Sequence, residues 1–186
     1  MRWSKPLQPK RAFQRPMLSF LFQGLTGPTA NGIALFGAIS AVARQPHWYI
    51  EGEVPDTFDG RFAVLATVAA LVAVRLEQLG QAGNSLSVAL VERFIEVMES
   101  EHRELGLGDP SLGKTVRKLV GSLARRTDLW RSAIAGEGGW RDSANRSVYR
   151  NEPDVAALDH VSEALKQFWL KLDRSDAGAL AAGRIA

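Results

Sequence analysis

One stretch of the chain has the residue types and spacing of a nucleotide-binding loop. Gly108 to Thr115 match the pattern G-x-x-x-x-G-K-[ST], in which backbone N–H groups cradle phosphates and the lysine reaches the terminal ones. Such a loop leaves a β-strand and enters a helix. The preceding segment, 86–105, has the apolar spacing of a helix instead, so we interpret this stretch as a connector between two helices. A nucleotide-binding switch is the alternative.

Other catalytic signatures are missing from the sequence. His47, His102 and His160 fall in three different predicted segments, with no paired spacing. The chain has no cysteine, which excludes a thiol nucleophile and a disulfide framework. It also has no G-x-S-x-G motif. We therefore expect a protein that is not an enzyme and that holds neither a metal nor a cofactor.

Charge is distributed in blocks along the 186 residues. Residues 1–50 carry six basic and no acidic side chains, residues 51–110 have a net charge of −7, and residues 111–150 have a net charge of +6. Two separate basic regions favour contact with an anionic surface, whether lipid, RNA or an acidic protein. No apolar run reaches the roughly 18 residues that a membrane span requires.

Hydrophobic periodicity predicts an all-α, single-domain bundle of about five helices and no strand. The predicted helices cover about 31–43, 59–79, 84–105, 110–135 and 153–172. The second of them is apolar on every side through Val74, which is typical of a central, buried helix. Residues 136–150 are expected to form a loop or a broken helix.

The bundle is predicted to occupy residues 29–174, between two looser ends. The arm of residues 1–28 places five basic residues before the apolar run Met17-Leu-Ser-Phe-Leu-Phe. It is a targeting segment, an amphipathic segment lying on a membrane, or a partly flexible terminus. The lack of an A-x-A-like site argues against a secretory signal. The Ala/Gly-rich tail, 175–186, is expected to be flexible.

Two surfaces are candidates for binding a partner. The loop at 47–62 crowds aromatic, acidic and turn-forming residues, and forms either a lid over the core or a concave surface for an apolar, basic segment. The helix at 110–135 places Lys114, Arg117, Lys118 and Arg125 opposite its apolar stripe, as a solvated face or a docking surface. Arg126 and Arg131 lie beside that stripe, where we expect ion pairs with acids such as Glu104 and Asp109.

Two blocks of sequence resemble the ubiquinol–cytochrome c chaperone family in its bacterial form. The first consists of Tyr49, the run Val54-Pro-Asp-Thr-Phe-Asp-Gly-Arg-Phe62, and Arg75-Leu76. The second runs from Arg103 to Asp109 and continues in Leu112-Gly-Lys114. Arg126 and Trp130 fall where the family has an Arg and a Tyr, whereas Val68 and Arg125 replace its usual His and Gly. The resemblance covers about 47–134 and implies that the second block joins two helices.

The resemblance implies a non-enzymatic assembly factor for the cytochrome bc1 complex that binds newly made cytochrome b. Implied partners are cytochrome b or bc1 assembly intermediates. Because mitochondrial members work with a small partner protein near the ribosomal tunnel exit, a ribosome or such a partner is implied as well. An anionic membrane is a further candidate. We expect a bacterial cytoplasmic protein at the inner membrane; the matrix side of the mitochondrial inner membrane is the alternative.

The resemblance and the two surfaces together define the expected site. Residues expected to contact partners are Trp48, Tyr49, Pro55, Asp56, Arg61, Phe62, Arg75, Arg103, Glu104, Asp109, Lys114, Lys118 and Arg126. Four glycines are expected to have structural roles, namely Gly60, Gly106, Gly108 and Gly113.

Overall fold

The structure is a computed structural model that describes residues 30–104 and 109–185, with side chains described from 31 to 101 and from 113 to 185. Within these ranges the regular structure is entirely helical, so the predicted all-α fold is confirmed. The elements are α1 (Ala30–Ala43), the 3₁₀ turn η2 (Pro46–Trp48), α2 (Phe58–Gln78), α3 (Gln81–Glu104), α4 (Asp109–Ile134), α5 (Trp140–Val148), α6 (Val155–Arg174) and α7 (Ala177–Ala181).

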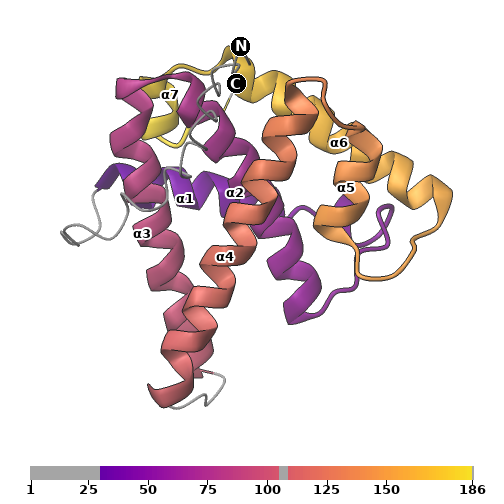
Figure 1. Cartoon of the computed structure of the whole chain (residues 1–186), viewed down its shortest axis with the longest axis horizontal. Coiled ribbons are helices and arrows are strands. Elements are labelled where there is room, and N and C mark those ends of the chain that lie inside the picture. Colours follow the sequence, from indigo (N-terminus) through magenta and orange to yellow (C-terminus); the bar gives the residue numbers. More distant parts are fainter. Residues whose placement is uncertain (1–29, 105–108, 186) are drawn as a thin grey trace, which may run out of the picture.

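Helix α2 is the centre of the fold. Every residue from Ala66 to Val74 is buried, as the apolar sequence predicts for a helix without a polar face. Helices α1, α3, α4, α5 and α6 all pack against it (Figure 1). Its start is fixed by Thr57, whose hydroxyl accepts a hydrogen bond from the N–H of Gly60 at 3.3 Å.

Helices α3 and α4 lie antiparallel, and their lower halves in Figure 1 extend side by side away from the other helices. Pro110 to Gly113, in the segment that a nucleotide loop would need, belong to the start of α4, and the element before it is helix α3. The described residues therefore lack the preceding strand that a nucleotide-binding loop requires. Gly106 and Gly108 lie outside those residues.

Helix α3 begins three residues earlier than the sequence indicates. Gly80 has a positive φ of 59°, which reverses the chain directly after α2, so that α3 starts at Gln81. Gly83 then passes so close to α2 that a Cβ atom there would lie 1.9 Å from the carbonyl oxygen of Leu76. Only glycine permits this tight turn between the two helices.

The polar segment after α4 and the C-terminal tail each contain a helix that the sequence does not predict. Residues 140–148 form α5, and Trp140 at its start donates a hydrogen bond to the carbonyl of Ser162 at 3.0 Å. Within the tail that the sequence predicts to be flexible, Ala177–Ala181 form α7. Asp176 caps this helix, and Leu180 is fully buried among α1 and α3.

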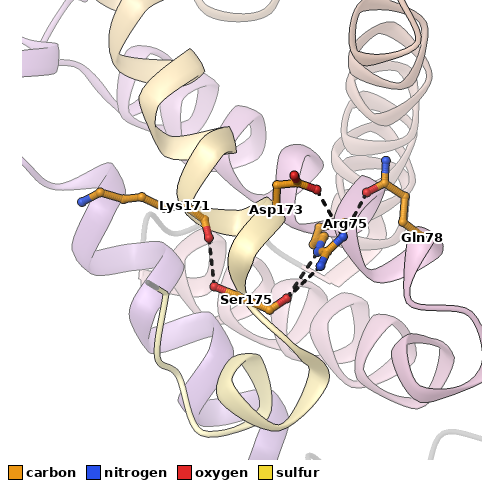
Figure 2. A network of polar contacts seen from close by, with 5 residues as sticks. All are labelled: Arg75, Gln78, Lys171, Asp173 and Ser175. Atoms are coloured by element: carbon orange, nitrogen blue, oxygen red, sulfur yellow. Dashed lines mark hydrogen bonds and ion pairs between the residues drawn. The ribbon is translucent and has the colours of Figure 1, made fainter.

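Arg75 ties the end of α2 to the junction of α6 and α7 (Figure 2). Its Nε and Nη2 both donate to the carbonyl oxygen of Ser175, at 3.3 and 3.1 Å, and its Nη1 lies 3.4 Å from Asp173. The Arg75 side chain is 16% exposed. Its donors are therefore bonded within the fold, whereas the sequence led us to expect contact with a partner.

Replacing Arg75 tests this structural role. We expect Arg75→Ala to lower the free energy of unfolding by about 1.5–3 kcal/mol, because hydrogen bonds from a charged, largely buried donor are lost. Arg75→Lys should restore little, since an ammonium group lacks the planar fork of donors. Urea denaturation followed by circular dichroism measures both. The exposed Arg174→Ala is the control, and an equal loss in that variant would contradict the role.

Candidate partner-binding groove

A groove of about 760 Å³ opens where α1, the loop that follows it, the start of α2 and the second half of α3 meet. Most of its lining is apolar or aromatic, and a few charged residues join it. The lining residues are Phe36, Ser40, Ala43, Arg44, Pro46, Tyr49, Ile50, Asp56, Thr57, Phe58, Arg61, Phe62, Leu65, Val97, Met98 and Glu101. The loop at 47–62 thus forms one wall of a concave surface, which is one of the two forms expected for it.

Apolar side chains in this groove are both packed beneath it and exposed on it. Phe94 of α3 lies beneath, with ring centroids 6.4 Å from Phe36 and 6.1 Å from Phe62. Ile50 and Phe58 are 70% and 41% exposed, although both are large and apolar. Grouped apolar exposure of this kind marks interaction sites in soluble proteins.

The loop wall is held by hydrogen bonds to two other segments, the end of α1 and the residue that follows α5. Trp48 is 1% exposed, and its Nε1 donates to the carbonyl of Val42 at 2.8 Å. The hydroxyl of Tyr49 donates to the carbonyl of Ala43 at 2.8 Å, and burial raises the pKa of this phenol. From the other side, the hydroxyl of Tyr149 donates to the carbonyl of Gly52 at 2.5 Å. The groove wall is therefore formed in advance of any partner.

Gly60 allows the loop to approach the first turn of α2. A Cβ atom at this position would lie 2.0 Å from the carbonyl oxygen of Pro55, closer than any real side chain approaches. Gly60 is itself buried. This close approach, together with the Thr57 cap, places Arg61 and Phe62 at the groove.

The rim of the groove carries charges of both signs. Arg61 Nε donates to Asp56 Oδ1 at 2.5 Å, and this hydrogen bond lowers the pKa of the Asp56 carboxyl. Both side chains are well exposed, at 66% and 58%, so their ion pair contributes little to folding. Arg44 and Glu101 are further charged groups of the lining. Charged side chains at the rim are well placed to orient a partner as it enters the groove.

Arg126 supports the groove from behind. Its Nε and Nη2 donate to the carbonyl of Ser147 at 3.0 and 2.8 Å, and its guanidinium carbon lies 5.9 Å from the centroid of the Phe62 ring. Burial is the main cause that lowers the pKa of Arg126 to about 10, helped by Arg125 and Arg150, so it stays charged at neutral pH. Arg126 therefore bonds a carbonyl near the end of α5, whereas the sequence led us to expect an ion pair with an acidic side chain.

Only some of the residues that the sequence predicts to contact a partner line the groove. The groove brings together Tyr49, Asp56, Arg61 and Phe62. Trp48, Arg75 and Arg126 are bonded within the fold instead, and Pro55 is exposed outside the lining. Arg131, expected to pair with Glu104 or Asp109, bonds Glu77 and Asp128 at 2.8 and 2.6 Å.

Of the second family block, the described residues Gly113 and Lys114 lie outside the groove lining. Lys114 and Lys118 are exposed on α4, outside the lining. At Gly113 a Cβ atom would meet open space, so the structure shows no steric need for glycine there. The side chains of Arg103, Glu104 and Asp109 fall outside the described part of the chain.

Sequence reasoning missed the groove residues that come from other helices. Phe36 lies on α1, Leu65 follows the first turn of α2, and Val97 and Met98 belong to the apolar stripe of α3. In sequence each is an ordinary core position with helical spacing. Only the packing of α1, α2 and α3 against one another shows that these side chains line a groove.

Neither a metal site nor a membrane-spanning helix is found in the described ranges. Within 30–104 and 109–185, no three His, Asp or Glu side chains gather closely enough to hold a metal ion. None of the helices there combines the length and apolarity needed to cross a bilayer.

Comparison with known proteins places the chain in a family. The sequence pattern described as ubiquinol-cytochrome C chaperone matches residues 51–186, and the chain belongs to this family. The match confirms the resemblance of the two blocks. The crystal structure of the Cbp3 homolog from Brucella abortus is similar, with a TM-score of 0.71 and 27% identity over 84% of this chain and 88% of that one. No curated protein matches the chain.

A histidine pair joins the groove loop to α6. His47 Nδ1 lies 3.0 Å from His160 Nε2, and the His47 ring packs on Trp48 with centroids 4.2 Å apart. Burial, then the nearby His160, lowers the pKa of His47 below 6.5, while Glu51 opposes the shift. A hydrogen bond between two imidazoles needs one neutral ring, so acid weakens this contact.

This pair predicts a pH dependence of stability. The folded state binds fewer protons at His47 than the unfolded state, so its contribution is complete above pH 6.5 and falls as the pH drops toward the folded pKa. We expect His160→Gln, which removes one cause of the shift, to make the decline between pH 7 and 5 shallower. Urea midpoints across this range measure it, and an unchanged slope would contradict the assignment.

Proposed function

We propose that this protein is an assembly chaperone for the cytochrome bc1 complex and that its groove holds an apolar segment of newly made cytochrome b. The observation that carries the proposal is the exposure of Ile50 and Phe58 on a groove whose wall is held in place by hydrogen bonds. Membership of the ubiquinol–cytochrome c chaperone family supports it. Cytochrome b, as an integral membrane protein, exposes apolar segments before it is inserted and assembled.

The lining and size of the groove suit temporary holding. A volume of about 760 Å³ is that of a ligand pocket, with room for a few side chains of one helix face rather than a whole membrane span. Met98 and the aromatic residues adapt to different apolar shapes. Because the groove is open and holds only part of one helix face, it binds its client weakly enough to release it when the membrane or the next subunit takes over.

The groove gives a direct mutational test. We expect Ile50→Asp combined with Phe58→Asp to weaken client capture by roughly tenfold or more, because burying such side chains contributes about 1.5–3 kcal/mol each. Cytochrome b recovered with the tagged protein and the haem b absorbance of isolated membranes measure the effect. Folding should be little changed, since both positions are exposed.

Val155→Asp is the matched control for that test. Val155 is 67% exposed, close to the 70% of Ile50, and lies outside the groove lining. Normal capture of cytochrome b by the groove variant, or an equal loss in the Val155 variant, would contradict the proposed site.

The basic side of α4 supports a peripheral position at the inner membrane of a bacterium. Lys114, Arg117, Lys118 and Arg125 are all exposed on this helix. Clustered basic residues gain about 1 kcal/mol each near an anionic lipid surface. Such contact would hold the groove close to the site where its membrane-protein client is inserted. A ribosome with its own anionic surface is the alternative contact.

Vesicle binding tests this membrane contact. We expect the wild-type chain to sediment with vesicles containing anionic lipid, and Lys114→Glu with Lys118→Glu to reduce that binding by about tenfold or more. The control is Lys166→Glu with Lys171→Glu, which reverses two exposed charges on α6. Equal binding to neutral vesicles, or equal losses in both variants, would argue against the basic side of α4 as a membrane surface.

A further inference from the structure

The chain itself carries a segment with the chemistry of an apolar, basic occupant. Five of the six residues from Met17 to Phe22 are apolar, and five basic residues precede them with no acidic residue among them. We propose that residues 11–25 of the N-terminal arm dock in the groove of their own chain and that the client displaces them from it. The inference concerns the groove of the proposed function but does not depend on which client binds.

The connection between the arm and the fold is long enough for this docking. Helix α1 begins at Ala30, and its residues Phe36, Ser40 and Ala43 line the groove. The eight residues from Phe22 to Ala30 span up to about 28 Å when extended. Helix α1 advances only about 9 Å from Ala30 to Phe36 and about 20 Å to Ala43. The connection is therefore long enough for residues 17–22 to reach the part of the groove that α1 lines.

Charge favours the arm over a neutral segment. Residues 1–25 carry basic residues alone, whereas the charged residues of the groove lining, Arg44, Arg61, Asp56 and Glu101, balance one another. Glu101 belongs to the lining, and Glu51 and Glu53 are exposed in the adjoining loop. Arg61 and Asp56 are paired with each other, which leaves Arg44 and Glu101 in the lining. The acidic excess at the edge of the groove therefore comes from Glu51 and Glu53, and these are the groups that Arg11 and Arg15 would meet on docking.

Docking of the arm would shield the apolar side chains of the groove from water when no client is bound. Exposed apolar patches promote association between copies, and Ile50 and Phe58 form such a patch. A tethered segment has an effective concentration in the millimolar range, so even weak contacts keep it bound. A client that matches the groove better displaces it, which makes binding selective.

The absence of cysteine permits a direct crosslinking test on the full-length chain. We expect Leu21→Cys with Ile50→Cys to be joined within one chain by a short bis-maleimide about tenfold faster than Leu21→Cys with Val155→Cys. Ile50 and Val155 are equally exposed, but only Ile50 lines the groove. Dilute protein and intact-mass measurement separate links within a chain from links between chains. Equal rates, or links formed only between chains, would overturn the proposal.

A second measurement asks whether the apolar run is what covers the groove. With Ile50→Cys as the only thiol, we expect Phe20→Asp with Phe22→Asp to speed its labelling by a water-soluble maleimide several-fold. The control pair Ser4→Asp with Gln8→Asp adds the same charge outside residues 11–25 and should leave the rate near that of the parent. If the Phe20 and Phe22 changes leave labelling unaltered while the groove still captures cytochrome b, the arm is not the occupant and the proposed function stands.

Discussion

The rest of the structure depends on the burial of helix α2. Between Ala66 and Val74 this helix has no exposed residue, so its free energy is favourable only when other helices cover every side. Helices α1, α3, α4, α5 and α6 supply that cover. Near its first turns the cover is incomplete, because Phe58 is exposed and Phe62 and Leu65 are only partly buried. The groove occupies this gap, lined by Phe58, Phe62 and Leu65 of α2 itself.

Polar contacts fix the geometry that apolar packing leaves open. Arg75 bonds a carbonyl at the end of α6, and Arg126 bonds one at the end of α5. In both cases a guanidinium from a central helix meets the carbonyl end of a later helix, where positive charge is favourable. Trp48 and Tyr49 hold the groove loop in the same way, by donating to carbonyls near the end of α1. Groove shape is therefore set by hydrogen bonds within the fold, one of which, from Tyr49 to Ala43, joins two lining residues.

Much of the fold could be predicted from the sequence because five helices have clear apolar periodicity. The sequence of helix α5 does not distinguish a helix from a loop, because it is polar, with Arg141, Asp142 and Arg146. Helix α7 lacks a periodic stripe, and its single buried side chain, Leu180, is a contact that only the folded chain shows. Local sequence patterns do not contain such long-range partners.

The site was only partly predictable for the same reason. Crowded aromatic and charged residues pointed to the loop with Tyr49, Asp56, Arg61 and Phe62, all of which line the groove. Residue type alone could not show that Arg75 and Arg126 bond carbonyls 100 and 21 residues away. Nor could it separate Phe36 and Met98, which line the groove, from other apolar residues of α1 and α3.

The most direct test of the groove as the client site is photo-crosslinking in growing cells. A photoreactive amino acid placed at Ile50 contacts whatever enters the groove, and one at Val155 reports on an equally exposed surface outside it. Our account predicts that the Ile50 probe captures cytochrome b while it is being made and that the Val155 probe does not. Capture of cytochrome b from both positions alike, or from neither while the protein still supports bc1 assembly, would contradict it.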